Sequence, residues 1–302
     1  MEIKIVINKH NKDKLLQLID QLVECEAHGI SAESTGATTF EKDSTSTSSS
    51  FLREVPKFEE FEVAEPKIVS SRFGTWGMFN SYVPGKAALR VLSNLIDEKG
   101  GKPVIFSELL NECISYFARS GLGKYRGFPK KTCESARQRL AMHLVLPYED
   151  MGLIRTQGNK KDPSVLFTKE GIEFTTLRNP LLDDGDKKKS LSEKESLWMR
   201  KHLRKIDQLG FKEFSVFVDL ANFLSGKEKR FREIVSWFKS NQSFVDWLKT
   251  GSRHRDNPKA FSRQLENVAR TFATGKIALL RELGVVSTAR ATYRVLQNLE
   301  DQ

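Results

Sequence analysis

The residues best placed to do chemistry in this sequence are cations gathered in two stretches. Residues 119–139 contain seven Lys and Arg residues and one Glu, which gives a local charge of +6. Residues 251–281 contain seven Lys and Arg residues and two acidic residues, which gives +5. Cations at this density suit contacts with a polyanion such as the phosphate backbone of nucleic acid. The alternatives for each stretch are an ordinary solvated surface and a face that docks a protein partner.

Catalytic motifs are weak by comparison. The three cysteines include no C-x-x-C pair, and the five histidines do not stand at metal-ligand spacing from one another. Neither a phosphate-binding glycine loop nor a Gly-x-Ser-x-Gly motif occurs. Residues 216–223 are similar to the strand-Asp-x-x-Asn start of some metal-dependent ribonucleases, with Asp219 as the metal ligand, but their flanks favour a buried helix. We therefore expect a non-catalytic protein with neither metal nor cofactor, and keep a nuclease around Asp219 as the alternative.

Length and composition allow two or three domains with real cores. The 302 residues are 39% hydrophobic and 29% charged, which argues against global disorder. No apolar run reaches the roughly 18 residues of a membrane span, and the N-terminus lacks the order of a signal peptide, so the sequence predicts a cytoplasmic protein, nucleoid-associated if prokaryotic. The net charge is +10, and nine acids against three bases between Cys25 and Glu65 leave +16 for the rest. A basic body of this size predicts a polyanionic partner.

The N-terminal quarter is predicted to contribute little to the core. Residues 1–25 change from alternating to helical spacing, which indicates a strand and then a helix. Twelve of the twenty residues from Ser31 to Ser50 are Ser or Thr, too polar to offset chain entropy, so residues 26–55 are predicted to be a disordered linker. Residues 56–83 are an extended connector in which Val63–Val69 could form a strand that pairs with the first, giving a small N-terminal αβ lobe.

A sharper pattern defines a domain over residues 84–178. It comprises a helix over 88–96 that ends at Gly100-Gly101, a short extended piece, a second helix capped by Ser107, a third helix from Thr132, and two strands at 152–156 and 165–168. We expect Pro147 to kink or shorten the third helix. Helix, short strand, helix, helix and hairpin is the order of a winged helix-turn-helix.

The chain resembles the winged-helix superfamily over about residues 85–174. The pattern that carries this resemblance is residues 148–154, a hairpin, and then residues 167–174. The resemblance is weaker over 191–290, where residues 278–286 repeat the junction between helix and strand. It implies a mainly α fold with small β wings, in which tandem winged-helix-like domains follow the N-terminal αβ lobe. The loop over 121–131 is longer than usual for this superfamily, and no clear second wing follows Val286.

Polar residues 179–190 are predicted to be a linker to a helical domain over residues 191–302. Five segments of that domain have helical spacing: 191–209, 214–224, 227–239, 244–248 and 260–283. The last of them places Phe261 and Leu265 on one side and Arg263 and Asn267 on the other, and we expect Gly275 to interrupt it.

If the docking mode of the superfamily applies, the helix from Thr132 lies in the major groove. Base contacts are then expected from Gln138 and Arg139, which share a face with Ser135 and Met142. Phosphate contacts are expected from Arg119, Lys124, Arg126, Lys130, Lys131, Arg137 and Arg139. Lys160 and Lys161 would reach out from the wing tip. The second basic stretch contributes Arg253, Arg255, Arg263, Asn267 and Arg270.

These observations predict a non-catalytic protein whose partner is double-stranded DNA. A regulator, a replication or partition factor of a mobile element, and the recognition subunit of a defence system all fit. The alternative is a tandem winged-helix adaptor in a larger DNA-associated complex, where the basic face also meets a protein partner. A requirement of that partner for DNA binding would distinguish the adaptor.

Overall fold

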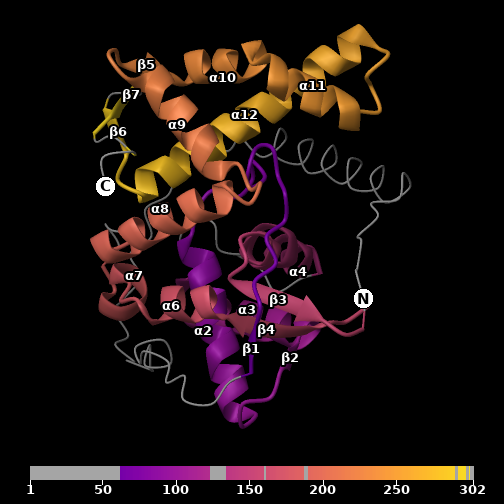
Figure 1. The fold of residues 1–302 in the computed structure, drawn as a ribbon, viewed down its shortest axis with the longest axis vertical. Coiled ribbons are helices and arrows are strands. Elements are labelled where there is room, and N and C mark those ends of the chain that lie inside the picture. Colours follow the sequence, from indigo (N-terminus) through magenta and orange to yellow (C-terminus); the bar gives the residue numbers. More distant parts are fainter. Residues whose placement is uncertain are drawn as a thin grey trace, which may run out of the picture. The chain divides into compact units, whose positions relative to one another are not determined.

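The computed structural model shows a mainly α protein, in which the described strands form two small β sheets (Figure 1). It describes residues 62–122, 134–159, 161–186, 190–289, 292–296 and 299. The predicted N-terminal strand, helix and Ser/Thr linker lie outside these ranges. The chain is divided into two compact units, and the described part of the smaller unit is residues 235–270. None of the described helices is both long and apolar enough to cross a membrane.

The larger unit begins with an alternation of helices and short strands. In chain order these are β1 (Val63–Ala64), α2 (Val83–Glu98), β2 (Val104–Ile105), α3 (Phe106–Arg119), α4 (Glu134–Leu140), the π-helical turn η3 (Ala141–Val145), α5 (Leu146–Asp150), β3 (Ile154–Gln157), β4 (Ser164–Thr168) and α6 (Lys169–Thr176). The elements from α2 to β4 are called the first module below. Their order is the one the sequence predicts.

The sheet of the first module is built on β4. Strand β3 pairs with it antiparallel in a hairpin, β2 pairs with it antiparallel, and β1 pairs with it in parallel. The strand expected over 63–69 is therefore cut to two residues. Because β1 pairs with Phe167 and Thr168 of β4, it belongs to this sheet, and the prediction that it pairs with the N-terminal strand finds no support here.

Helix α2 forms the centre of this part of the core. Every residue from Val83 to Ser93 is buried, and α3, α6 and η3 all contact the helix. Gly100 and Gly101 adopt φ angles of 64° and 83°, and the Gly101 amide donates to the Ile96 carbonyl, which ends the helix. The predicted glycine stop is thus confirmed. The Ser107 cap is wrong, since α3 begins one residue earlier, after Ile105.

The predicted linker over residues 179–190 is also wrong in its described part. Pro180–Asp184 form helix α7, and Asn179, which is fully buried, caps it by accepting hydrogen bonds from the Leu181 and Leu182 amides. Gly185 ends it with a φ of 68°. Polar residues at this density predict a solvated linker. In the structure, however, Asn179 caps α7 and Asp183 pairs with Arg90.

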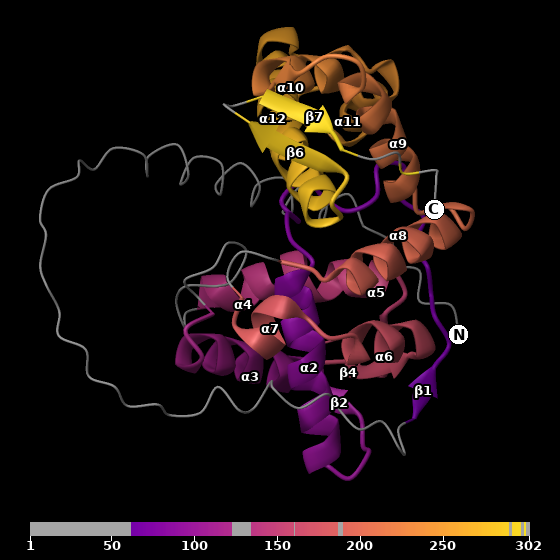
Figure 2. The same cartoon turned by 90° about the vertical axis from the view of Figure 1, so that its left-hand side faces the viewer.

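A second series of helices and strands follows. In chain order these are α8 (Glu193–Asp207), α9 (Glu213–Leu224), β5 (Lys229–Arg230), α10 (Phe231–Ser240), α11 (Gln242–Gly251), α12 (Pro258–Glu282), β6 (Val286–Ala289) and β7 (Thr292–Val295). The elements from α9 to β7 are called the second module. Two expectations differ from the structure here. The segment from Lys227 begins with the strand β5. From Val286, β6 and β7 form a hairpin where no clear second wing is expected (Figure 2).

The two modules share one strand order. In the first, the short strand β2 pairs with β4, the last strand of the β3–β4 hairpin. In the second, β5 likewise pairs antiparallel with β7, the last strand of the β6–β7 hairpin. Each short strand stands between the first two helices of its module. The second module differs by the additional helix α11 before its last helix.

Helix α12 continues through Gly275 instead of stopping there. A Cβ atom at this position would lie 2.1 Å from the Gly77 carbonyl oxygen and 2.9 Å from that of Phe79. Gly275 is therefore explained by the close approach of another backbone, which no larger residue permits.

Candidate nucleic-acid interface

One face of the helical stretch from Glu134 to Asp150 packs against α2. Leu140, Leu144 and Tyr148 are buried, and the Tyr148 hydroxyl donates to the carbonyl oxygen of Tyr82, next to the start of α2. Leu144 and Tyr148 also line a small apolar cavity with α2. The opposite face is therefore kept toward solvent by side chains that pack on α2.

Two of the predicted base-reading residues lie on this outer face. Gln138 and Arg139 are exposed, whereas Arg137 and Met142 are half-buried. The side chain of Ser135 lies outside the described residues. Gln138 and Arg139 are thus available to a partner, and Met142 is less so than the sequence suggests.

Pro147 changes this helical stretch without ending it. The chain widens into the π turn η3, in which the Leu146 amide donates to the Ala141 carbonyl, and α5 then begins with Pro147 in its first turn. Proline has no N–H and its ring crowds the carbonyl four residues earlier, so a wider turn before it relieves that contact. The kink or shortening expected at Pro147 therefore takes another form, a π turn before the proline, and the helical stretch continues to Asp150.

The tip of the β3–β4 hairpin is tied to the start of α3. The Asp162 carboxylate accepts hydrogen bonds from the Ser107 amide at 2.9 Å and from its hydroxyl at 2.6 Å, and the Phe106 amide donates to the Pro163 carbonyl. Lys161, next to this anchor, is exposed. Lys161 at the tip of the hairpin therefore has a fixed base, while Lys160 lies outside the described residues.

The remaining predicted phosphate contacts of this region are described only in part. Arg119 is exposed at the end of α3 and pairs with Glu112 at 2.6 Å. Four further cations lie outside the described residues: Lys124, Arg126, Lys130 and Lys131. The structure thus places Arg139 and Lys161 at the surface of the first module. Of the seven cations in the +6 stretch, it describes Arg119, Arg137 and Arg139.

The predicted DNA contacts of the second basic stretch lie in the smaller unit, and its helix has the two faces that the sequence predicts. Exposed positions are Arg253, Arg255, Arg263, Asn267 and Arg270, while Phe261, Leu265 and Val268 are half-buried. Part of this charge is paired. Glu266 accepts hydrogen bonds from Lys239 at 2.5 Å and from Arg270 at 2.8 Å, which lower the pKa of its carboxyl. Arg255 pairs with Asp256 at 3.3 Å.

One cation counted in this patch is not at the surface. Lys276 is fully buried, and its Nζ lies 2.6 Å from Glu213 Oε2 and 2.6 Å from the Thr75 carbonyl oxygen. Glu213 also accepts the Thr75 amide and hydroxyl. Lys276 therefore joins α12, α9 and the segment before α2, and cannot contact a polyanion.

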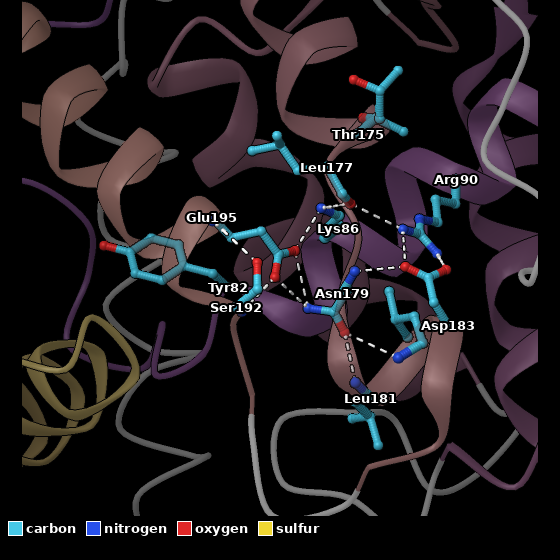
Figure 3. Close-up of polar contacts among 12 residues, drawn as sticks. Tyr82, Lys86, Arg90, Thr175, Leu177, Asn179, Leu181, Asp183, Ser192 and Glu195 are labelled. Carbon is cyan, nitrogen blue, oxygen red and sulfur yellow. Dashed lines mark hydrogen bonds and ion pairs between the residues drawn. The ribbon is translucent and has the colours of Figure 1, made fainter.

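A second buried network joins α2 to α7 and α8 (Figure 3). Lys86 Nζ lies 2.5 Å from Glu195 Oε1 and donates to the Leu177 carbonyl at 2.6 Å. Arg90 forms a two-point ion pair with Asp183, and Asn179 Nδ2 donates to both carboxylate oxygens of Glu195. Burial lowers the pKa of Lys86 to about 8, against the opposing effect of Glu195. The network positions helices, and its cations face inward.

Sequence reasoning overlooked the cations of α8. Arg200, Lys201, Arg204 and Lys205 line a cavity of about 410 Å³. The signal was present, because four cations in six residues at spacings of four share one side of a helix. They were assigned to an ordinary helical segment because α8 lies outside both of the basic stretches.

The alternative of a nuclease around Asp219 loses its structural premise. Asp219 is exposed on helix α9 and does not end a strand. Within the described part of the chain, no three His, Cys, Asp or Glu side chains gather closely enough to hold a metal ion. The comparisons add no family assignment: no family model, no curated protein and no solved structure matches this chain.

Proposed function

We propose that this chain binds duplex DNA, without catalysis, through two winged-helix domains in tandem, within residues 84–178 and 191–302. The observation that carries the proposal is the repeated strand order β2–β4–β3 and β5–β7–β6, each with a short strand after the first helix and a hairpin after the last. This order supports the proposal because it is the one expected of winged helix-turn-helix domains, in which a recognition helix enters the major groove.

The exposed chemistry of the first module supports a DNA partner. Arg139 and Gln138 project from the helix that would enter the groove, and these side-chain types pair through two hydrogen bonds with guanine and adenine edges. Lys161 at the wing tip and Arg119 at the end of α3 are exposed cations suited to phosphates. The first module would therefore supply both base and backbone contacts.

The second module would add backbone contacts from Arg253, Arg255, Arg263 and Arg270, with Asn267 beside them. Two linked modules raise affinity through effective concentration without requiring new contacts. The location that we propose is cytoplasmic, nucleoid-associated if the protein is prokaryotic. Regulation, replication or partition, and defence all use proteins of this kind.

Fluorescence anisotropy tests the proposal directly. The full chain is titrated into labelled random duplex, single-stranded DNA and RNA from about 50 to 200 mM salt. Duplex binding should dominate and weaken steeply with salt, and Arg263→Ala should weaken binding to all sequences alike. Arg178→Ala, which removes an exposed arginine outside both patches, is the matched control. Equal losses from Arg178→Ala and Arg263→Ala would contradict the assigned surface.

Base reading by Arg139 needs a selected site. Once a preferred sequence is found, Arg139→Ala should cost about 1–3 kcal/mol at one base position and little on random duplex. Equal losses on both would remove Arg139 from the base-reading set. Failure of the full chain to bind duplex at low salt would favour the adaptor, in which a protein partner is required.

A further inference from the structure

Helix α8 lines a cavity in the larger unit that neither basic patch includes. Its volume is about 410 Å³, within the range of small-molecule sites. The cations Arg200 and Arg204 are four residues apart, as are Lys201 and Lys205, so two adjacent rows of positive charge face it. Among the described residues that line the cavity, none is acidic.

The helix that carries these cations is firmly held from its other side. His202 and Met199 are buried, and His202 Nε2 lies 2.9 Å from the Met151 carbonyl oxygen. The His202 ring also stacks on Trp198 with centroids 4.9 Å apart. The cations therefore project from a fixed support, which lowers the entropic cost of binding an anion.

Arg200 differs from an ordinary surface arginine. Its residue exposure is only 8%, and the loss of hydration lowers the pKa of its guanidinium. Arg200 lines the cavity beside Arg204, so its guanidinium can contribute charge-assisted hydrogen bonds to an anion bound there. Arg204 and Lys205 lie in the last turn of α8, where cations also offset the helix dipole.

The rest of the cavity is apolar. Leu197, Phe214 and Leu299 line it beside the cations, and Gln208 adds an amide. A concave site that combines an apolar wall with several cations suits a small ligand with an anionic end and a nonpolar or planar body. The backbone of a DNA duplex presents its phosphates on a convex surface, and it has no apolar group that would pack against the apolar wall.

From this combination we propose that the α8 cavity binds a small phosphate ester with a planar or apolar body, a class that includes nucleoside monophosphates. Arg200 and Arg204 bind the phosphate oxygens. Lys201 supports them, and Lys205 is shared with Glu170, which lies 2.9 Å away. Phe214 and Leu299 cover the body of the ligand. The site is additional to the proposed DNA interface and does not depend on it.

Isothermal titration calorimetry of the full chain tests the site with adenosine monophosphate, adenosine and inorganic phosphate as probes. The monophosphate should bind more tightly than either of its parts. Arg204→Gln should weaken its binding by about tenfold or more, the usual value of a charge-assisted hydrogen bond. Because Arg204 is exposed, the variant should fold normally, and unchanged circular dichroism checks this.

The control variant is Lys194→Gln, which removes an exposed cation from the same helix outside the cavity. It should leave the affinity within about twofold. The proposal fails if the monophosphate does not bind, if adenosine binds equally well, or if the two variants lose affinity equally. It also fails if a short DNA duplex displaces the monophosphate, since the cavity would then belong to a nucleic-acid surface.

Discussion

Replacing Lys86 by Met should destabilise the protein by about 3 kcal/mol. The change leaves the Glu195 carboxylate buried without its cation, and breaking a buried pair in this way costs about 3–5 kcal/mol. Both side chains are 0% exposed and their charged atoms lie 2.5 Å apart. We place the cost at the lower end because the Asn179 amide and the Ser192 N–H still donate to Glu195, and because Met fills nearly the same volume.

A matched pair at the surface isolates the effect of burial. Lys99 and Glu108 lie 2.6 Å apart, almost the same distance, but their side chains are 34% and 38% exposed. Lys99→Met should therefore cost less than about 1 kcal/mol. Urea unfolding followed by circular dichroism at pH 7, below the pKa of Lys86, gives the midpoint and slope of each variant.

The double variant decides whether the two charges act together. Once Lys86 is Met, changing Glu195 to Gln removes the uncompensated charge, so the double variant should be about 2 kcal/mol more stable than the sum of the single changes predicts. Equal costs for Lys86→Met and Lys99→Met, or additive single changes in the cycle, would refute the view that α8 is held on α2 by a buried ion pair.

Two further changes test other parts of the fold. Gly275→Ala should cost about 1–3 kcal/mol in thermal unfolding because its Cβ would meet the Gly77 carbonyl, whereas Ala at the exposed neighbour Thr274 should be nearly neutral. Burial raises the pKa of Asp150 to about 6, so its contribution to stability is present below about pH 4 and lost as the pH rises through 6. Asp150→Asn should then be about 2 kcal/mol more stable than the parent at pH 7.5 and equal to it near pH 4; a pH-independent difference would contradict this.

The spacing of apolar residues predicted most of the helices correctly. The spacing did not predict which polar residues are buried in the interior. Lys86 and Glu195 are 109 positions apart, and nothing local marks either as buried. Lys276 was counted as a surface cation for the same reason. Residues of α7 were assigned to a linker because Asn179 and Asp183 are polar, although their partners are an amide, a carboxylate and a guanidinium within the fold.

The candidate site was predicted to a similar extent. The outward direction of Gln138 and Arg139 follows from the helical period, and the structure agrees. The partners of the cations do not follow from it, because ion pairs such as Lys239 with Glu266 depend on which helices pack together. The α8 cavity was overlooked because part of its apolar wall comes from other segments, Phe214 of α9 and Leu299, which is almost 100 residues from Arg200.

The short strands β2 and β5 carry the topological argument. The sequence predicts β2 as a short extended piece between two helices, whereas β5 lies in a segment that was expected to be helical. A strand of two residues has no alternating pattern, so it exists only through its partner in the hairpin. Once both are visible, the modules can be aligned by their hairpins: Arg139 precedes the start of β3 by 15 positions, and Arg270 precedes that of β6 by 16. Under the tandem proposal Arg270 is therefore the closest counterpart of Arg139. Because Arg270 already pairs with Glu266, we expect the second module to contribute more to phosphate binding than to base reading.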